Sequence, residues 1–260
     1  MVDIHSHALF NVDDGSKSLE ESVIMIKEAK ESGFETICLT PHYLESYYEN
    51  NKFENDKMLG KLKEELVRQD IHMELVLGNE VYINTNILEL LEFEKITKIG
   101  NSNYMLIELP MNQELRYVKD IINELVNKGI RVIIAHPERY KYVQKDISYL
   151  EQFLDMGVVF QSNYASILGH YGDEAKKTIK KLLKGKMIQI MATDAHRCNS
   201  IYKKIDEIQK RLKKEIDKEY FYLITQDNPK KVLRNEDVVI LEYCSKPKFK
   251  LFGWYEIFLK

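Results

Sequence analysis

The sequence lacks the features that mark several large classes of protein. No apolar run in its 260 residues approaches the roughly 18 residues that a membrane-spanning helix needs. The first residues, Met-Val-Asp-Ile-His, have neither the basic nor the apolar region of a signal peptide. The formal net charge of -3 is not that of a basic nucleic-acid-binding protein. We therefore expect a cytoplasmic protein, and its length suffices for one large α/β domain.

Cysteine is scarce as well, with three in the whole chain. Cys38, Cys198 and Cys244 are too far apart for a C-x-x-C metal or redox motif. Their odd number argues against a disulfide framework and for a reducing compartment. None has an arginine six positions later, which is the spacing of the cysteine-dependent phosphatases. We therefore expect no thiol nucleophile and no thiolate metal site.

Strand-like and helix-like segments alternate along the chain. The expected strands are short and apolar, and they cover residues 2–5, 34–39, 73–77, 104–109, 131–135, 158–161 and 187–192. The expected helices cover residues 18–32, 53–69, 86–91, 116–128, 147–155 and 173–183, with further helices in 201–233. About seven strand-helix units in this order are typical of a parallel sheet covered by helices. The run 132–134, Val-Ile-Ile, is apolar on both faces, as buried parallel strands are.

Nine residues of metal-binding types occur where the chain leaves six of these seven strands. They are His5, His7, Asp14, His42, Glu80, Glu108, His136, Asp194 and His196. Active residues of α/β barrels gather at the carboxyl ends of the strands. The pattern therefore predicts a multinuclear metal site on a barrel rim, and hence hydrolysis. The two remaining histidines, His72 and His170, fall outside the pattern and are expected to be structural or on the surface.

The spacing within the set supports shared ions. His5 and His7 are two residues apart on an extended segment, so both imidazoles point the same way, and Asp194 and His196 repeat this geometry. Asp3 lies on the same face and could orient a metal-bound imidazole. The alternative for each of these residues is an ordinary polar side chain at the end of a strand.

The charges suit a phosphate substrate. Four carboxylates and three divalent ions would leave the site near +2, which matches a phosphate dianion. Nitrogen and oxygen ligands without thiolates fit manganese, iron or zinc, and such ions lower the pKa of bound water and hold the attacking and leaving oxygens. Arg139 and Arg197 follow motif histidines closely and could bind phosphate oxygens bidentately, or form surface salt bridges instead.

These residues resemble the polymerase and histidinol phosphatase (PHP) family of metal-dependent hydrolases. Within it, the chain is most similar to the bacterial manganese-dependent protein-tyrosine phosphatases of capsule and exopolysaccharide operons. Asp14 favours this branch, because histidinol phosphatases more often have histidine in that loop. The motifs are D-I-H-S-H at 3–7, D-D-G at 13–15, T-P-H at 40–42, G-N-E at 78–80, I-E-L-P at 107–110, A-H-P-E-R at 135–139 and T-D-A-H at 193–196.

The resemblance implies a distorted seven-stranded (β/α)7 TIM-like barrel of PHP type over residues 1–245, holding three divalent ions, with manganese expected and iron or zinc as alternatives. A metal-bridging hydroxide would attack phosphotyrosine without a phosphoenzyme, with Arg139, Arg197, Asp194 and His196 as catalytic residues. The implied ligands are His5, His7, Glu80 and Asp194 for the first ion, Glu80, Glu108 and His136 for the second, and Asp14, His42 and His196 for the third.

The resemblance also implies a substrate, the tail of a bacterial tyrosine kinase that controls capsule or exopolysaccharide synthesis. A location beside that membrane kinase would follow. One departure is that the family's arginine-proline segment after the last motif is replaced by residues 197–202, Arg-Cys-Asn-Ser-Ile-Tyr. Arg197 could substitute for the usual arginine from a different backbone position.

Two further segments carry aromatic residues. Tyr43, Tyr47 and Tyr48 follow the T-P-H motif and could stack on a phosphotyrosine ring, or simply pack. Residues 246–260 form a basic, aromatic tail that could rest on an anionic membrane, or pack on the barrel or a neighbouring subunit. Three alternatives to the tyrosine phosphatase stay open. They are a small-molecule phosphomonoesterase such as a histidinol phosphatase, a nuclease, and a non-catalytic metal-binding regulator of a kinase.

Overall fold

The computed structural model describes residues 1–245, so the tail at 246–260 lies outside the described residues. Its strands are all parallel and form two sheets. The three-stranded sheet has the order β1 (Val2–Ser6), β2 (Thr36–Leu39), β4 (Glu74–Leu77). The six-stranded sheet has the order β3 (His42–Tyr43), β5 (Glu80–Tyr82), β6 (Tyr104–Glu108), β7 (Arg131–Ala135), β8 (Val159–Asn163), β9 (Ile190–Ala192). The expected α/β class with parallel strands is confirmed.

Two of the expected strands continue beyond a break. The strand expected at 34–39 ends at Thr40-Pro41 and resumes as β3, while the strand expected at 73–77 ends at Gly78-Asn79 and resumes as β5. β2 pairs with β4 before these breaks, and β3 pairs with β5 after them. Both strands therefore cross together from one sheet to the other. The described strands form two sheets and not one continuous seven-stranded barrel.

The two sheets meet again at the other side of β1. The amide of Asp194 donates to the carbonyl of His5, and the amide of His7 donates to the carbonyl of Ala195, both at 2.9 Å. An isolated parallel bridge also joins Ser6 and Ala195. These contacts bring the segment after β9 against the end of β1. They place the pair His5 and His7 beside the pair Asp194 and His196.

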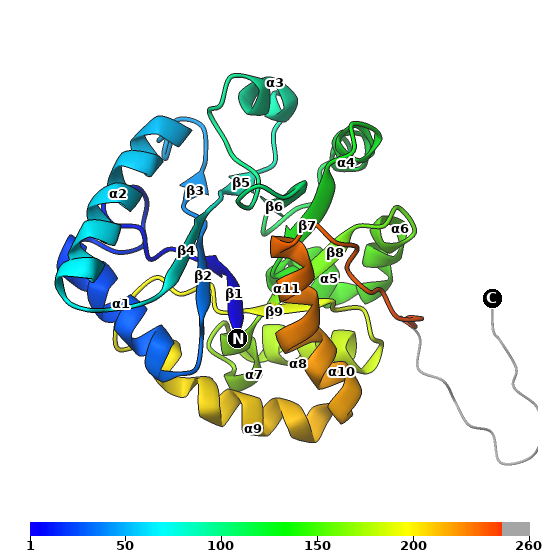
Figure 1. The fold of residues 1–260 in the computed structure, drawn as a ribbon. Coiled ribbons are helices and arrows are strands. Elements are labelled where there is room, and N and C mark those ends of the chain that lie inside the picture. The colour runs from blue at the N-terminus through cyan, green and yellow to red at the C-terminus, as the bar shows by residue number, and fades with distance from the viewer. Residues whose placement is uncertain (246–260) are drawn as a thin grey trace, which may run out of the picture.

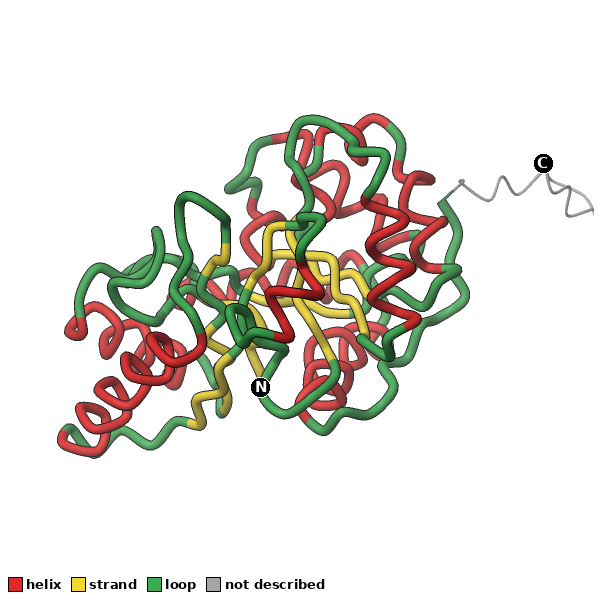
Figure 2. The backbone as a smooth tube through the Cα atoms, turned by 90° about the horizontal axis from the view of Figure 1, so that it is seen from above, coloured by secondary structure: helices red, strands yellow, loops and turns green. Residues whose placement is uncertain are grey.

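Helices surround the strands, as Figures 1 and 2 show. The α-helices are α1 (Leu19–Glu31), α2 (Lys52–Arg68), α3 (Ile87–Glu92), α4 (Val118–Asn127), α5 (Lys141–Lys145), α6 (Glu151–Leu154), α7 (Tyr164–Leu168), α8 (Asp173–Lys184), α9 (Ile205–Glu215), α10 (Lys218–Tyr222) and α11 (Asn228–Leu233). Short 3-10 helices cover Pro137–Arg139, Ile147–Leu150 and Tyr202–Lys204, and a π-helical turn covers Leu223–Asp227. The helix expected at 147–155 is therefore divided, and α7 was not expected.

Local sequence explains where the two long early helices begin. The Ser18 side chain accepts a hydrogen bond from the Glu21 amide and caps α1. Asn51 and Glu54 form a reciprocal capping box at the start of α2. Gly33, with φ of 86°, lies beyond the end of α1 in the left-handed region that glycine tolerates.

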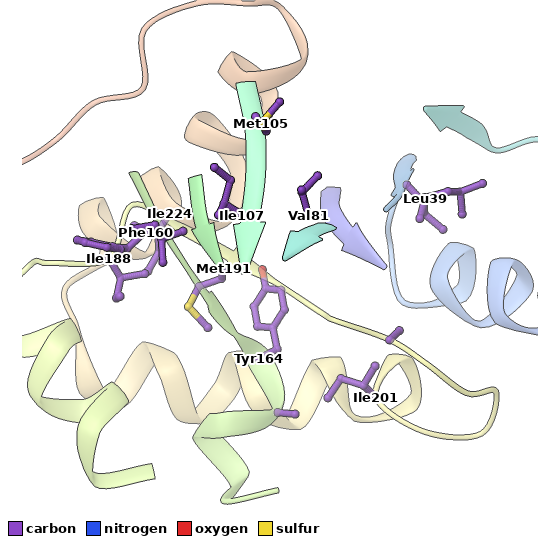
Figure 3. Close-up of a cluster of buried hydrophobic side chains, with 14 of the residues drawn as sticks. Leu39, Val81, Met105, Ile107, Phe160, Tyr164, Ile188, Met191, Ile201 and Ile224 are labelled. Atoms are coloured by element: carbon purple, nitrogen blue, oxygen red, sulfur yellow. The ribbon is translucent and has the colours of Figure 1, made fainter. Parts of the chain in front are cut away.

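The strands are apolar on both faces, and each face packs into a separate cluster. Leu106 and Ile133 belong to an inner cluster that Val232 of α11 also joins. Met105 and Phe160 belong to the larger cluster between the strands and the helices, part of which Figure 3 shows. The inner apolar cluster ends where the polar residues at the carboxyl ends of the strands begin. The inner cluster is therefore an apolar layer directly below these polar residues.

None of the helices in residues 1–245 is both long and apolar enough to cross a bilayer.

Candidate metal centre

All nine metal-binding residues predicted from sequence lie together at the carboxyl ends of the strands. Each has a nitrogen or carboxylate oxygen within 3.7 Å of another member of the set. Three overlapping groups have ligand atoms within 4.8 Å of one another and could each hold an ion. The groups are His5, His7, Glu80 and Asp194; His42, Glu80 and Glu108; and His7, Asp14, His42 and His196.

The first group is completely enclosed. The Nε2 atoms of His5 and His7 lie 3.1 Å apart, and each is 3.1–3.2 Å from Glu80 Oε2 and 3.3–3.4 Å from Asp194 Oδ1. The His5 and His7 side chains are buried. Among the described residues, neither Glu80 Oε2 nor Asp194 Oδ1 receives a hydrogen bond, although both atoms are buried.

A chain of hydrogen bonds fixes which nitrogen of His5 carries its proton. The Asp194 carboxylate can only accept, so Asn163 donates to Asp194 Oδ2 through its Nδ2, at 2.6 Å. Asn163 Oδ1 then accepts from Gln161 Nε2 at 2.8 Å. Gln161 Oε1 is left to accept from His5 Nδ1, also at 2.8 Å. The His5 proton therefore resides on Nδ1, and the lone pair of Nε2 faces the group.

Asp13 fixes the position of the proton on the His7 ring. Its Oδ2 accepts from His7 Nδ1 at 2.7 Å and from the His42 amide at 2.9 Å, and its Oδ1 accepts from the Gly15 amide at 2.8 Å. The Nε2 atoms of two imidazoles and two carboxylate oxygens therefore converge on one point. This set of nitrogen and oxygen donors fits a divalent cation well.

Gly15 is required by the close approach of this loop to His7. A Cβ at Gly15 would lie 2.1 Å from the His7 carbonyl oxygen and 2.5 Å from the His7 Cβ. We expect Gly15→Ala to destabilise the protein by about 3 kcal/mol and to weaken metal binding. Thermal denaturation with and without added manganese measures both effects.

Gly60 provides the matched control for this substitution. It is exposed in α2, and a Cβ there would meet nothing within 4 Å. Gly60→Ala should raise stability by up to ~1 kcal/mol, because alanine is the better helix former. Equal behaviour of the two variants would contradict the packing that we assign to Gly15.

The second group is centred on Glu80 and Glu108. His136 Nε2 lies 2.8 Å from Glu80 Oε1 and 3.7 Å from Glu108 Oε1, and His42 Nδ1 lies 3.1 Å from Glu80 Oε2. Burial, together with the neighbouring Glu80 charge, raises the pKa of Glu108 to about 8. Two carboxylates that share a site raise the pKa of one of them, and a cation held between them would favour the charged form of both.

Two of the candidate ligands, both at the ends of strands, have unusual backbone conformations. His136 and Asp194 have φ of 33° and 53°, in the left-handed region that non-glycine residues seldom adopt. Burial and the positive charge of Arg139 lower the pKa of His136 to about 4, so its imidazole is neutral and able to bind metal. In His5, burial opposes protonation, but the Glu80 and Asp194 charges raise the pKa to about 9, so a proton on Nε2 would have to leave when a cation binds.

The third group is open to solvent. The side chain of Asp14 is 49% exposed, and that of His196 is 29% exposed. His196 Nε2 lies 3.4 Å from Asp14 Oδ1, His42 Nε2 lies 3.7 Å from the same oxygen, and the His7 and His196 rings stack 4.0 Å apart. A hydrogen bond from His196 holds the pKa of the Asp14 carboxyl well below its usual range. Substrate can therefore reach the centre from this side.

The prediction that Asp3 orients an imidazole was wrong. The Asp3 carboxylate accepts from the Thr193 amide at 3.0 Å, from the Thr193 hydroxyl and from the Tyr202 hydroxyl at 2.9 Å. Asp3 therefore fixes the backbone just before Asp194 and contacts no histidine ring. The residues that do contact the rings, Asp13 and Gln161, were not selected from the sequence.

A cavity of about 560 Å³ adjoins the metal-binding groups, and its wall includes Arg139, Tyr171, Asp194, His196 and Arg197. Arg139 Nη1 donates to Asp194 Oδ2 at 3.1 Å, and its guanidinium lies 4.5 Å from the centre of the Tyr171 ring. Arg197 donates to the carbonyls of Gly15 and His196. Both arginines predicted from the sequence therefore lie beside the centre, Arg139 at its inner wall and Arg197 at its exposed edge.

The three tyrosines after the T-P-H motif and the two remaining histidines lie in different surroundings. Tyr48 lies parallel to the His42 ring with their centres 6.0 Å apart, whereas Tyr47 is 77% exposed and Tyr43 is buried. His72 is on the surface, where it pairs with Asp70, while His170 lines the cavity.

Comparison with known proteins places this chain among capsule-synthesis proteins. Residues 1–234 match the family model described as "Capsular polysaccharide synthesis, CpsB/CapC". A putative tyrosine-protein phosphatase CapC from Staphylococcus aureus is 34% identical over 196 residues, which are 75% of this chain and 77% of that protein. The tyrosine-protein phosphatase YwqE from Bacillus subtilis is 29% identical over 255 residues, covering 98% of this chain and 100% of YwqE.

Solved structures agree with this placement. A crystal structure from work on YwqE of Bacillus subtilis and CpsB of Streptococcus pneumoniae, described as unique metal-dependent tyrosine phosphatases, superposes with a TM-score of 0.89 at 27% identity. It covers 95% of this chain and 100% of the solved chain. Histidinol phosphate phosphatase from Lactococcus lactis shares the fold, with a TM-score of 0.54 at 16% identity, covering 82% of this chain and 93% of its own.

Proposed function

The chain belongs to the capsular polysaccharide synthesis family CpsB/CapC, and on that premise we propose that it is a metal-dependent phosphatase that removes phosphate from tyrosine residues of a protein. The names of relatives that match nearly the whole chain support the tyrosine-phosphatase activity. The gathering of nitrogen and oxygen ligands around Glu80, at the edge of a cationic cavity, carries the proposal.

The proposed ligand sets overlap the three groups, with His136 in place of His42 in the second because His136 Nε2 lies 2.8 Å from Glu80 Oε1, and with His7 kept in the first alone. We assign His5, His7, Glu80 and Asp194 to a first ion, Glu80, Glu108 and His136 to a second, and Asp14, His42 and His196 to a third. Nitrogen and oxygen donors without thiolates fit manganese, iron or zinc, and we propose manganese among these because of the resemblance to manganese-dependent tyrosine phosphatases. Bound ions would lower the pKa of water and neutralise charge on the phosphate oxygens. The closeness of His42 to Glu80 and of His7 to Asp14 supports a compact trinuclear centre.

Arg139 is proposed to bind the phosphate group. Its guanidinium is held by the Asp194 carboxylate and the Tyr171 ring, while 27% of its side chain stays exposed toward the cavity. A guanidinium fixed in this way can offer two parallel donors to a phosphate. Arg197 is proposed to act from the edge, since its hydrogen bond to the Gly15 carbonyl ties it to the loop that bears Asp14, and it also donates to the carbonyl of the preceding residue, His196. Asp194 and His196 act as ligands of the reacting centre.

The chain's own residues offer no thiol route to a phosphoenzyme. Cys38 is fully buried, and burial raises the pKa of its thiol well above the usual value. Cys198 is not among the residues that line the cavity, and it lacks the arginine spacing of a thiol phosphatase. Direct attack by water on phosphorus, with the phenolate as leaving group, is therefore the proposed reaction.

Metal content tests the proposed centre directly. We expect the purified protein to bind up to three manganese ions per chain, with full loss of phosphatase activity after chelation and recovery on adding manganese back. Elemental analysis by inductively coupled plasma mass spectrometry gives the count. An active protein that retains no ion after chelation would contradict the proposal.

Tyr48 is expected to contact the phosphotyrosine ring. Its ring stacks beside His42 at the open side of the centre, where a phenyl phosphate would enter. Tyr48→Ala should lower kcat/KM for a phosphotyrosine peptide about fivefold more than for a small alkyl phosphate, because an aromatic pair contributes about 1 kcal/mol. Tyr47→Ala is the control, and it should add little because this side chain projects into solvent. If Tyr48→Ala lowered kcat/KM equally for both substrates, Tyr48 would not contact the phosphotyrosine ring.

The biological setting is proposed from the family. We infer that the substrate is the tail of a bacterial tyrosine kinase that controls capsule or exopolysaccharide synthesis, and that the phosphatase works in the cytoplasm beside that kinase. Residues 1–245 are proposed to act as one phosphatase unit of PHP type. Its two sheets are proposed to be the interrupted wall of a distorted seven-stranded barrel. The backbone contacts between β1 and the segment after β9 support this.

A further inference from the structure

The cavity beside the metal centre is larger than a phosphate group needs and is strongly cationic at its edge. Its inner wall is formed by buried residues, Thr193, Asp194 and Ala195. Its outer wall includes the exposed side chains of Arg197 and Lys204. The inner end adjoins the ligands, so the outer end lies where the substrate chain beyond the phosphotyrosine would pass.

Positive charges outnumber negative charges on the wall of the cavity. Arg139, Arg197 and Lys204 line the cavity, and Asp194 is the one carboxylate among its lining residues. Asp194 already pairs with Arg139 at 3.1 Å. The remaining two cations face a cavity in a protein whose formal net charge is -3, so this surface differs in sign from the molecule as a whole. A cavity of one sign attracts a ligand of the other.

Lys204 differs from its neighbour in having no ion-pair partner among residues 1–245. Lys203 Nζ forms an ion pair with Glu28 Oε1 at 3.2 Å and also contacts Asn199. Lys204 lies at the end of the 3-10 helix Tyr202–Lys204 and lines the cavity, and no acidic side chain in residues 1–245 pairs with it. Its ammonium group is therefore available to a ligand, while that of Lys203 is engaged elsewhere.

We propose that Lys204, with Arg197, forms a subsite for an anionic side chain close to the phosphotyrosine in the substrate sequence. This inference rests on the proposed function and specifies the substrate class of the same site. Leu168 and Ile201 supply apolar wall for the methylene groups of such a side chain. The anion is a carboxylate of aspartate or glutamate, or the phosphate of a second phosphotyrosine, because both present oxygen acceptors to the same two cations.

Steady-state kinetics on three matched peptides tests the subsite. The peptides share one phosphotyrosine, and the residues on both sides of it carry glutamine, glutamate or a second phosphotyrosine. At low salt, kcat/KM should be about fivefold higher for an anionic flank than for glutamine, which is what an exposed ion pair contributes. The preference should shrink in 0.5 M salt, because exposed charges are then screened. Preference for glutamate identifies the carboxylate, and preference for the second phosphotyrosine alone identifies the phosphate.

Two variants separate the subsite from a general charge effect. Lys204→Glu should abolish the preference or reverse it in favour of glutamine, whereas Lys203→Glu makes the same change of charge at the adjacent residue and should keep the preference. Equal rates on all three peptides with the native enzyme would overturn the subsite and leave the phosphatase proposal intact. The same effect from both lysine variants would also overturn it. Absence of hydrolysis of any phosphotyrosine peptide by the manganese-loaded enzyme would overturn both proposals.

Discussion

Replacing Glu80 with glutamine should reduce phosphotyrosine hydrolysis by a factor on the order of a thousand or more. Glu80 Oε2 lies within 3.2 Å of nitrogens of His5, His7 and His42, and Oε1 lies 2.8 Å from His136. Glutamine keeps the shape but removes the negative charge that the first two proposed ions share. We therefore expect the variant to fold, to lose bound metal, and to stay inactive when excess manganese is added.

The control for this variant is a glutamate at the start of a strand, away from the site. Glu74 begins β4, at the opposite end of the strands from the site, and its carboxylate accepts from the Thr36 hydroxyl. Glu74→Gln should keep native activity and metal content. Circular dichroism confirms that both variants fold, and elemental analysis counts their ions. A Glu80→Gln enzyme with normal metal content and turnover would show that Glu80 does not hold the proposed ions.

Replacing Asp13 with asparagine should weaken metal binding about 10–100-fold, the usual effect of losing a partner behind a metal-bound histidine. Asp13 accepts three hydrogen bonds, from His7 Nδ1 and from the amides of Gly15 and His42. With its NH2 group at the Oδ2 position, asparagine faces His7 Nδ1 and the His42 amide with a donor in place of an acceptor. His7 would then move its proton to Nε2, which points it at Glu80 and Asp194 and displaces the cation.

This variant differs from Glu80→Gln in one measurable respect. Because its metal ligands are all intact, Asp13→Asn should regain most of its turnover at high manganese concentration, whereas Glu80→Gln should not. A manganese titration of activity for both variants distinguishes the two roles. If Asp13→Asn required no more manganese than the native enzyme, Asp13 would not control the His7 tautomer.

The positions of the strands were predictable because the apolar runs of buried parallel strands are distinctive. The run 131–135 reads as a strand without ambiguity, and β7 covers exactly those residues in Arg131–Ala135. The breaks at Thr40-Pro41 and Gly78-Asn79 were not predicted, since each depends on the neighbouring strand breaking at the same level. The gathering of the nine candidate ligands follows from parallel strands ending at one edge of the fold.

The residues that orient the ligands could not be found in the same way. Gln161 contacts His5 from 156 residues away, and no local pattern links them. One signal was present, however. The expected strand at 158–161 was the only one without a candidate ligand, yet β8 ends in the polar run Gln161-Ser162-Asn163 inside the protein. Buried polar residues at the end of a strand need partners, and here the partners are His5, Glu138 and Asp194.

The most direct test of the whole account is phosphate release from a phosphotyrosine peptide and from histidinol phosphate, measured in parallel after chelation and after adding manganese back. We expect no release from either substrate after chelation, and manganese-dependent release from the peptide at a rate well above that from histidinol phosphate. Preference for histidinol phosphate would make the enzyme a small-molecule phosphatase, and release that persists after complete removal of metal would contradict the metal centre.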